Sequence, residues 1–340
     1  MQRVKHRLLK YLPPVLGLLV LGGVLVGLHG ALKRLSFDDV MAALTNTPRL
    51  QVYHALGLLG LSFCFMLIYD VPGILFAKQR GDFPPLAWRR IGLASFCAYA
   101  LSHVVGAPAI SAAAIRLRLY AQWGVPPSGI GRIMTLSGTT FMTGVCVLLG
   151  AVLLLNPTDL PLFGHTVAPL VLRGLGAVLW GLIIIYVALA HGTKPLAVFG
   201  VNIPRPGFLV ATAQVVLSCV DTATACGILY VVLPTVHGLT YAHVLAFYMA
   251  GFAGGLLSGL PGGVGVFDSL LLLGMAGYMD PAAAVGAILL FRVLYYLAPA
   301  GLAGVIFISH EVFITAGKKR VPELNSFQKK PKSRKNRRPF

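Results

Sequence analysis

The chain has 340 residues, of which 57% are hydrophobic and 11% charged, and its mean hydropathy is +0.81. This composition excludes an ordinary soluble enzyme, because several windows exceed the roughly 18 apolar residues that predict a membrane-spanning helix. The net charge of +18 does not indicate a nucleic-acid-binding protein, since residues 1–10 and 318–340 hold half of the Lys and Arg. Basic tails beside membrane helices typically bind anionic lipid head groups on the cytoplasmic side.

The first half of the chain predicts three full spans, at about residues 12–32, 51–77 and 128–155. Residues 91–121 lie between the last two, and the basic residues flanking them place both ends of this segment in the cytoplasm. The segment is interrupted at Gly106-Ala107-Pro108. Each leg is then about 14 residues, or roughly 21 Å, which is shorter than a ~30 Å hydrocarbon core. We therefore expect a hairpin that enters from the cytoplasmic side.

The second half repeats this pattern with the opposite sense. Full spans are predicted at about 168–190, 207–232 and 281–309. Residues 243–278 must begin and end outside, because the last span has to return the basic tail to the cytoplasm. This segment is broken at Ser258–Asp268, SGLPGGVGVFD, which is rich in glycine and proline. It predicts a second hairpin that enters from the other face.

The predicted fold is therefore an all-α polytopic membrane protein with six full spans and two re-entrant or short paired helical hairpins. Residues 51–155 and 207–309 form an inverted repeat within a transmembrane domain at 1–315, and residues 316–340 are expected to be a disordered basic cytoplasmic tail. Inverted repeats with broken helices near the bilayer midplane are typical of transporters. Broken backbone is tolerated at that depth only inside protein or beside a water-filled cavity.

Few ionisable residues belong to these apolar segments: Asp221, Asp268 and Arg292 lie inside them, Arg116 and Arg118 close the first hairpin, and Asp70 closes the second span. A charge in hydrocarbon is costly, so such groups usually face a cavity and pair. We expect Asp268 and Arg292 to pair, and a helix beginning near Gly263 would direct backbone N–H groups at a phosphate. Arg116 and Arg118 point in different directions on a helix, so only one need face a cavity. Each group also has a structural interpretation, as an internal ion pair or an interfacial anchor.

No catalytic motif, metal-ligand spacing or cofactor motif is present in the sequence, so we expect neither an enzyme nor a metal or cofactor site. The five cysteines lie singly in apolar stretches and are interpreted as small buried hydrophobic residues.

Several motifs stand out in the apolar segments: Tyr69-Asp70, Trp88–Phe96, Arg116–Tyr120, Pro261–Asp268 and Arg292–Pro299. Together they resemble the lysylphosphatidylglycerol synthetase/flippase transmembrane family, the membrane half of MprF-type proteins. The octapeptide Pro261–Asp268, PGGVGVFD, is close to that family's PGGLGVFE, and Arg292–Pro299 is similar to its arginine and tyrosine segment. Tyr69-Asp70, Trp88–Phe96 and Arg116–Tyr120 also match, so the resemblance covers about residues 10–312. Many members carry Asn-Asn and Gly-Gly pairs in the first hairpin, where this chain has His103-Val104 and Ala112-Ala113.

The resemblance implies the translocation module, and without the family's soluble aminoacyl-transferase domain we expect no lipid aminoacylation. It implies a flippase that moves a polar, aminoacylated or anionic phospholipid, such as lysylphosphatidylglycerol, between leaflets of a bacterial inner membrane, with both termini cytoplasmic. Arginine would bind phosphate, and Asp221 and Asp268 would meet a cationic head group or carry protons. The expected translocation residues are Arg116, Arg118, Asp221, Pro261, Gly262, Gly263, Asp268, Arg292 and Tyr296.

Two other functions fit the same sequence. One is an ion- or proton-coupled solute transporter, with coupling through Asp221. The other is a non-transporting partner of a separate lipid-modifying enzyme, with the basic tail as the docking site. The sequence leaves the direction of transport, the energy source and the oligomeric state open.

Overall fold

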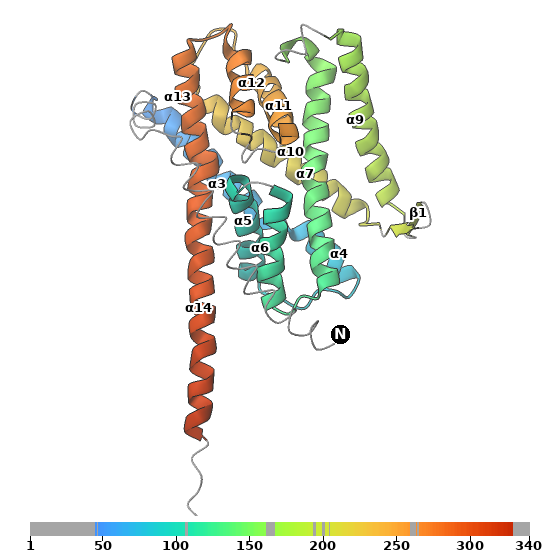
Figure 1. The fold of residues 1–340 in the computed structure, drawn as a ribbon. Coiled ribbons are helices and arrows are strands. Elements are labelled where there is room, and N and C mark those ends of the chain that lie inside the picture. Colours follow the sequence, from blue (N-terminus) through green and yellow to red (C-terminus); the bar gives the residue numbers. More distant parts are fainter. Residues whose placement is uncertain are drawn as a thin grey trace, which may run out of the picture.

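A computed structural model describes Thr45 and residues 47–105, 108–160, 167–192, 195–198, 201–203, 205–258, 263 and 265–328. Within these ranges the fold is helical (Figure 1), apart from an antiparallel ribbon of β1 (Leu196–Val198) and β2 (Val201–Ile203). The described residues contain five helical segments that are long and apolar enough to span a membrane: Arg49–Gln79, Pro127–Leu155, Pro169–Ala190, Phe208–Val232 and Pro281–Ile314. This confirms the predicted all-α polytopic fold. The predicted first span, at about 12–32, lies outside the described residues.

The first repeat consists of a broken span, a hairpin and a long span. Helices α3 (Arg49–Ile68) and α4 (Val71–Gln79) form the first of these, and they are interrupted at Tyr69 and Asp70. Helices α5 (Trp88–Val105) and α6 (Pro108–Gln122) pack against each other as the predicted hairpin. Helix α7 (Pro127–Leu155) completes the repeat, and a proline at its N-terminus starts the helix at a position where the missing N–H costs nothing.

Helix α9 (Pro169–Ala190) links the two repeats and follows the short 3₁₀ turn η1 (Pro157–Asp159). It packs closely on α7, because a Cβ added to Gly176 would lie 2.8 Å from the carbonyl oxygen of Gly150. Most of its large apolar side chains are exposed. In a membrane protein such an outer face contacts lipid tails, so α9 lies at the periphery of the bundle.

The second repeat begins with α10 (Phe208–Val232) and a hairpin of α11 (Tyr241–Ser258) and α12 (Val266–Met275). Helix α12 has 10 residues, so at 1.5 Å per residue it reaches only about 15 Å and cannot cross a bilayer. The two hairpins occupy opposite ends of the molecule, with α11 and α12 in the upper part of Figure 1 and α5 and α6 in the lower part. This arrangement agrees with the predicted opposite senses of the two hairpins.

The last span contains a break in helical hydrogen bonding. It consists of α13 (Pro281–Phe291), the π-helical segment η3 (Arg292–Leu297) and α14 (Ala298–Gln328). Helix α14 continues to Gln328, into the region expected to be a disordered tail from residue 316. Residues 329–340 lie outside the described residues.

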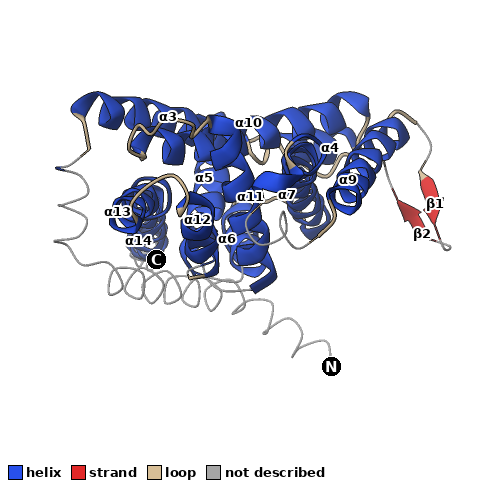
Figure 2. Ribbon diagram, turned by 90° about the horizontal axis from the view of Figure 1, so that it is seen from above, coloured by secondary structure: helices blue, strands red, loops and turns tan. Residues whose placement is uncertain are grey.

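The helices converge on an aromatic core. Seen from above, α5 and α11 lie near the middle of the molecule, with α13 and α14 on one side and α7 and α9 on the other (Figure 2). Buried tyrosine and phenylalanine rings fill the space where the hairpins meet the last span. The rings of Tyr248, Phe267, Phe291, Tyr295 and Tyr296 are in mutual contact. Tyr99 joins this cluster through its hydroxyl, which lies 3.3 Å from that of Tyr295.

Candidate functional site

Asp268 and Arg292 form the ion pair that the sequence predicts. The guanidinium binds the carboxylate through two bonds, from Nε to Oδ1 at 2.7 Å and from Nη2 to Oδ2 at 2.8 Å. This two-point geometry is the strong form of an Arg–carboxylate pair. The side chains are 10% exposed for Arg292 and 23% exposed for Asp268, so the pair is shielded but not sealed.

The backbone around Asp268 brings this pair to the start of the half-helix α12. Gly263 and Gly265 have φ angles of 62° and 88°, which side chains with a Cβ rarely adopt. The N–H of Gly265 donates to Asp268 Oδ2 at 2.9 Å, so the carboxylate also caps the helix. Pro261 and Gly262, which were also expected at this site, lie outside the described residues.

Aromatic rings line the guanidinium. Its Cζ atom lies 5.6 Å from the ring centre of Phe267 and 5.4 Å from that of Tyr296. Both distances suit cation–π attraction. Tyr296 therefore belongs to the same site as Arg292, as the sequence predicts, and the π-helical segment η3 supplies both residues. Segments of this kind frequently occur at functional sites.

Asp221 lies in the middle of α10 and is 1% exposed. Its Oδ2 accepts a hydrogen bond of 2.5 Å from the hydroxyl of Tyr99, which lies 3.3 Å from the hydroxyl of Tyr295. Its Oδ1 has no hydrogen-bond partner among the described residues. Tyr99, on α5 of the first hairpin, therefore connects Asp221 on α10 with Tyr295 on the last span.

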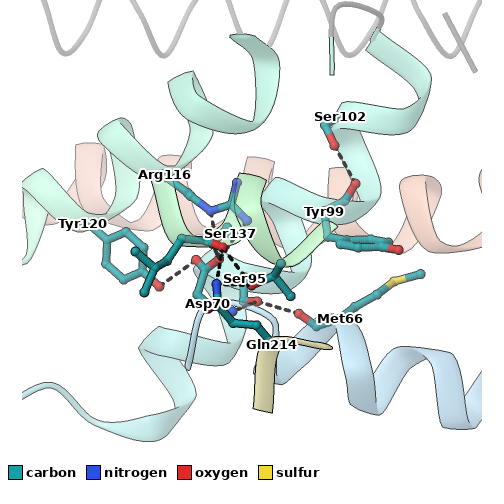
Figure 3. Close-up of polar contacts among 11 residues, drawn as sticks. Met66, Asp70, Ser95, Tyr99, Ser102, Arg116, Tyr120, Ser137 and Gln214 are labelled. Carbon is teal, nitrogen blue, oxygen red and sulfur yellow. Dashed lines mark hydrogen bonds and ion pairs between the residues drawn. The ribbon is translucent and has the colours of Figure 1, made fainter. Parts of the chain in front are cut away.

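Arg116 has a different environment from the one expected. It donates to Asp70 Oδ1 from Nε at 2.9 Å and from Nη2 at 2.7 Å, and the two side chains are 7% and 0% exposed. Ser137 also donates to Oδ1 and Tyr120 to Oδ2, each at 2.9 Å, as Figure 3 shows. The structure thus gives Arg116 a buried carboxylate where access to a phosphate was expected.

Arg118 also has an internal partner. Its Nε donates to Glu311 Oε1 at 3.1 Å and its Nη2 to Oε2, while Gln122 donates to Oε1 at 2.9 Å. These bonds tie α6 to α14. The two arginines point apart, as their spacing predicts, but both join the first hairpin to neighbouring elements and neither reaches the Asp268–Arg292 pair.

The two acids Asp70 and Glu311 and the hydrogen-bond donor Tyr99 are not in the set of translocation residues predicted from the sequence. Asp70 had a detectable signal, because an acid between two apolar helical stretches needs a cation. Glu311 is the acid that follows the last apolar stretch, and it matches the nearby positive charge on α6. Tyr99 carries no local signal, since a tyrosine in an apolar helix resembles any other core residue.

Comparisons with known proteins agree with this architecture. No protein-family model matches the chain. The uncharacterized protein slr0712 of Synechocystis is 27% identical over 299 residues, covering 88% of this chain and 91% of that protein. The inner membrane protein YbhN of Escherichia coli is 27% identical over 274 residues, covering 80% and 83% of the two chains. Phosphatidylglycerol lysyltransferase of Staphylococcus aureus is 24% identical over 326 residues, covering 94% of this chain and 36% of that protein.

The chain is a homologue of YbhN-like inner membrane proteins and of phosphatidylglycerol lysyltransferase. The resemblance inferred from the Pro261–Asp268 motif and its companions is confirmed by these matches, at low identity over most of the chain. The similarity to YbhN and slr0712 runs along most of each protein. The similarity to the lysyltransferase covers about a third of that longer protein.

Proposed function

We propose that this protein moves a polar phospholipid between the leaflets of the bacterial inner membrane. Two relatives support this proposal. One is named an inner membrane protein, and the other is named for a reaction on phosphatidylglycerol. In this proposal the chain is a carrier rather than an enzyme, spans the membrane several times and has both termini in the cytoplasm.

One observation carries the proposal: the partly exposed Asp268–Arg292 pair at the start of the half-helix α12. Arg292 can form the same two-point bond with a phosphodiester that it now forms with Asp268. Asp268 would then be released to meet an ammonium group on the same lipid. A head group with a phosphate and an ammonium group would replace the Asp268–Arg292 pair with two new pairs, phosphate with Arg292 and ammonium with Asp268. This favours a zwitterionic or aminoacylated phospholipid.

In this proposal the two hairpins form the route for such a head group. In this scheme the two hairpins enter from opposite faces, and the 10-residue α12 reaches only part of the way across the membrane. Movement of one hairpin opens one face while the other stays closed, which is alternating access in inverted-repeat transporters. In this scheme Arg116 and Arg118 fix the first hairpin to Asp70 and Glu311, and they act on transport through its position.

A second candidate is an ion- or proton-coupled solute transporter. The buried carboxylate of Asp221 favours it, because acids within membrane segments often mark ion pathways. The third function, a non-transporting partner of a lipid-modifying enzyme, depends on residues 329–340, which lie outside the described part of the chain.

Reconstitution into liposomes tests the proposal. Vesicles would hold acyl-chain-labelled fluorescent phosphatidylglycerol, phosphatidylethanolamine or lysylphosphatidylglycerol, and dithionite would bleach the label in the outer leaflet. We expect the protein to remove the protected fraction for a lipid with both a phosphate and an ammonium group. Arg292→Gln and Asp268→Asn should each slow this loss at least about tenfold, the loss of roughly 1.4 kcal/mol of interaction.

The matched control is Asp280→Asn, which changes an exposed capping carboxylate on α13. It should leave transport unchanged. Equal rates for Arg292→Gln and the unmodified protein would contradict the assignment of the site. Uptake of a water-soluble substrate with no movement of any lipid would instead support the solute transporter.

A further inference from the structure

The orphaned oxygen of Asp221 is the feature of the described core that the lipid site does not explain. An ionised carboxylate that is 1% exposed and bonded through one oxygen only would be costly in an apolar interior. Native proteins relieve this cost with a cation, a further donor or a proton. The groups that face Asp221 decide which of these applies.

The side chains around Asp221 are phenols. Four tyrosines lie close enough to interact with its charge: Tyr69 at the end of α3, Tyr99 on α5, Tyr248 on α11 and Tyr295 on η3. His103 stacks on Tyr99, at 4.7 Å between ring centres, and one of its ring nitrogens is bonded to the Tyr99 carbonyl oxygen. None of these residues brings a positive charge to Asp221.

The nearest arginines are bound by other carboxylates. Arg116 is held by Asp70 and Arg292 by Asp268, each through two nitrogens. Neither gives a hydrogen bond to Asp221 Oδ1. Internal ion pairing therefore does not neutralise Asp221 in this conformation.

A metal ion is a poor match for the surroundings. The described residues contain no group of three or more His, Cys, Asp or Glu that could hold one. Hard cations such as Ca²⁺ need six or more oxygen ligands, mostly carboxylates, carbonyls or water. A buried carboxylate ringed by phenols offers too few. A proton needs one oxygen and no space.

We propose that Asp221 is a proton-binding site whose occupancy is coupled to the movement of the first hairpin. With a proton on Oδ1 the carboxyl group is neutral and suits the closed, buried position. Release of the proton to water leaves a charge that must be hydrated, so the ionised form favours a conformation in which α5 and η3 part around Asp221. The proton is taken from the aqueous phase on one side and returned on the other, and no covalent bond to a heavy atom changes.

The contacts explain why protonation would move the hairpin. Tyr99 donates to Asp221 and belongs to the first repeat, whereas Asp221 and Tyr295 belong to the second. Ionisation strengthens the bond from Tyr99 to Oδ2, because hydrogen bonds to charged groups are about twice as strong as neutral ones. This gain is smaller than the cost of burying a charge on Oδ1, which has no donor, so the ionised form still favours opening and hydration. The charge on one atom thus changes the attraction between the two repeats. The use of this coupling for lipid transport rests on the proposed function, but the proton site does not.

Infrared difference spectroscopy of the purified protein tests the site without any transport. We expect a carbonyl stretch of a protonated carboxyl group that titrates with pH and is lost in Asp221→Asn. Asp280→Asn should keep the band. Tyr99→Phe keeps the carboxyl group of Asp221 but removes the hydrogen bond that stabilises its ionised form. The band should therefore persist, and the midpoint of its pH titration should move to higher pH.

Each result decides the proposal. Absence of a band that depends on Asp221, in protein with an unchanged melting temperature, would overturn it. So would a band that Na⁺ removes at constant pH, which would indicate a cation site. If Asp221→Asn does not fold, the Tyr99→Phe shift alone decides the matter, and an unshifted midpoint counts against the site.

Proteoliposomes separate this inference from the proposed function. An imposed pH gradient should change the rate of lipid movement severalfold in the unmodified protein and have no effect in Asp221→Asn. A titrating band with no lipid movement would leave the proton site intact and refute the flippase. Lipid movement that does not depend on the pH gradient, together with the absence of a titrating band, would support the flippase and refute the proton site.

Discussion

The two repeats hold their ion pairs in different ways. In the first repeat, Asp70 is fully buried, its carboxylate accepts hydrogen bonds from Arg116, Ser137 and Tyr120, and its backbone N–H donates to the hydroxyl of Ser95. In the second, Asp268 is 23% exposed, follows a glycine-rich turn and is bonded directly to Arg292. The same chemical pair therefore forms a closed centre in one repeat and an accessible centre in the other.

This difference teaches that charge inside a membrane protein is not by itself a sign of a transport site. Around Asp70, neighbouring side chains saturate the carboxylate, so exchange with a ligand would break several bonds at once. Asp268 has fewer donors and is partly exposed, so under the proposed function a ligand could replace it as the partner of Arg292. What distinguishes the two centres is how many donors surround the acid and how much of it remains exposed.

The largest expected effect is on the closed centre. Asp70→Asn removes the charge that neutralises Arg116 and should lower the free energy of unfolding by about 3–5 kcal/mol, the cost of leaving one partner of a buried pair. Melting temperature in detergent measures it. A double variant, Asp70→Asn with Arg116→Met, should recover part of the loss. Equal stability of the single variant and the unmodified protein would contradict the idea of a sealed centre.

The accessible centre should respond less in stability. Arg292→Gln should lower the free energy of unfolding by about 1–2 kcal/mol. The loss is small because Asp268 still accepts the hydrogen bond from the N–H of Gly265 and remains partly exposed to solvent. The same melting experiment applies, run beside Asp70→Asn. If Arg292→Gln is the more damaging of the two, the contrast between the centres is reversed.

The smallest effect should come from the turn before α12. Gly265→Ala places a Cβ on a backbone with φ of 88°, and although nothing lies within 4 Å, the strain should cost about 1 kcal/mol. Gly174→Ala on α9 is the control, because this helical glycine also has open space and should gain stability slightly. A loss of stability in the control would show that added bulk, rather than strain, is responsible.

Much of the architecture could be predicted from the sequence because hydropathy and basic residues act locally. The spans, both hairpins and their opposite senses follow from Lys and Arg placement and from two interruptions. The Asp268–Arg292 pair also follows, since the two residues flank consecutive elements. Asp221 is recognisable because few acids persist in the middle of an apolar helix.

The partners of the other charges could not be predicted in this way. Arg116 and Asp70 lie 46 residues apart, and Arg118 and Glu311 lie 193 apart. Which acid faces which arginine depends on how α6 packs against α3, α7 and α14, and no local pattern encodes it. The hydroxyl of Tyr99 reaches Asp221 across 122 residues for the same reason.

The π-helical segment η3 has a mechanical consequence. Tyr295 and Tyr296 are adjacent in sequence and equally buried, yet one contacts the surroundings of Asp221 and the other stacks on Arg292. The short segment η3 therefore contributes one residue to the surroundings of Asp221 and others to the Asp268–Arg292 site. A twist of this turn about the axis of the last span moves the backbone of Arg292 and of Tyr295 together, so a movement at one site is passed to the other along a few covalent bonds.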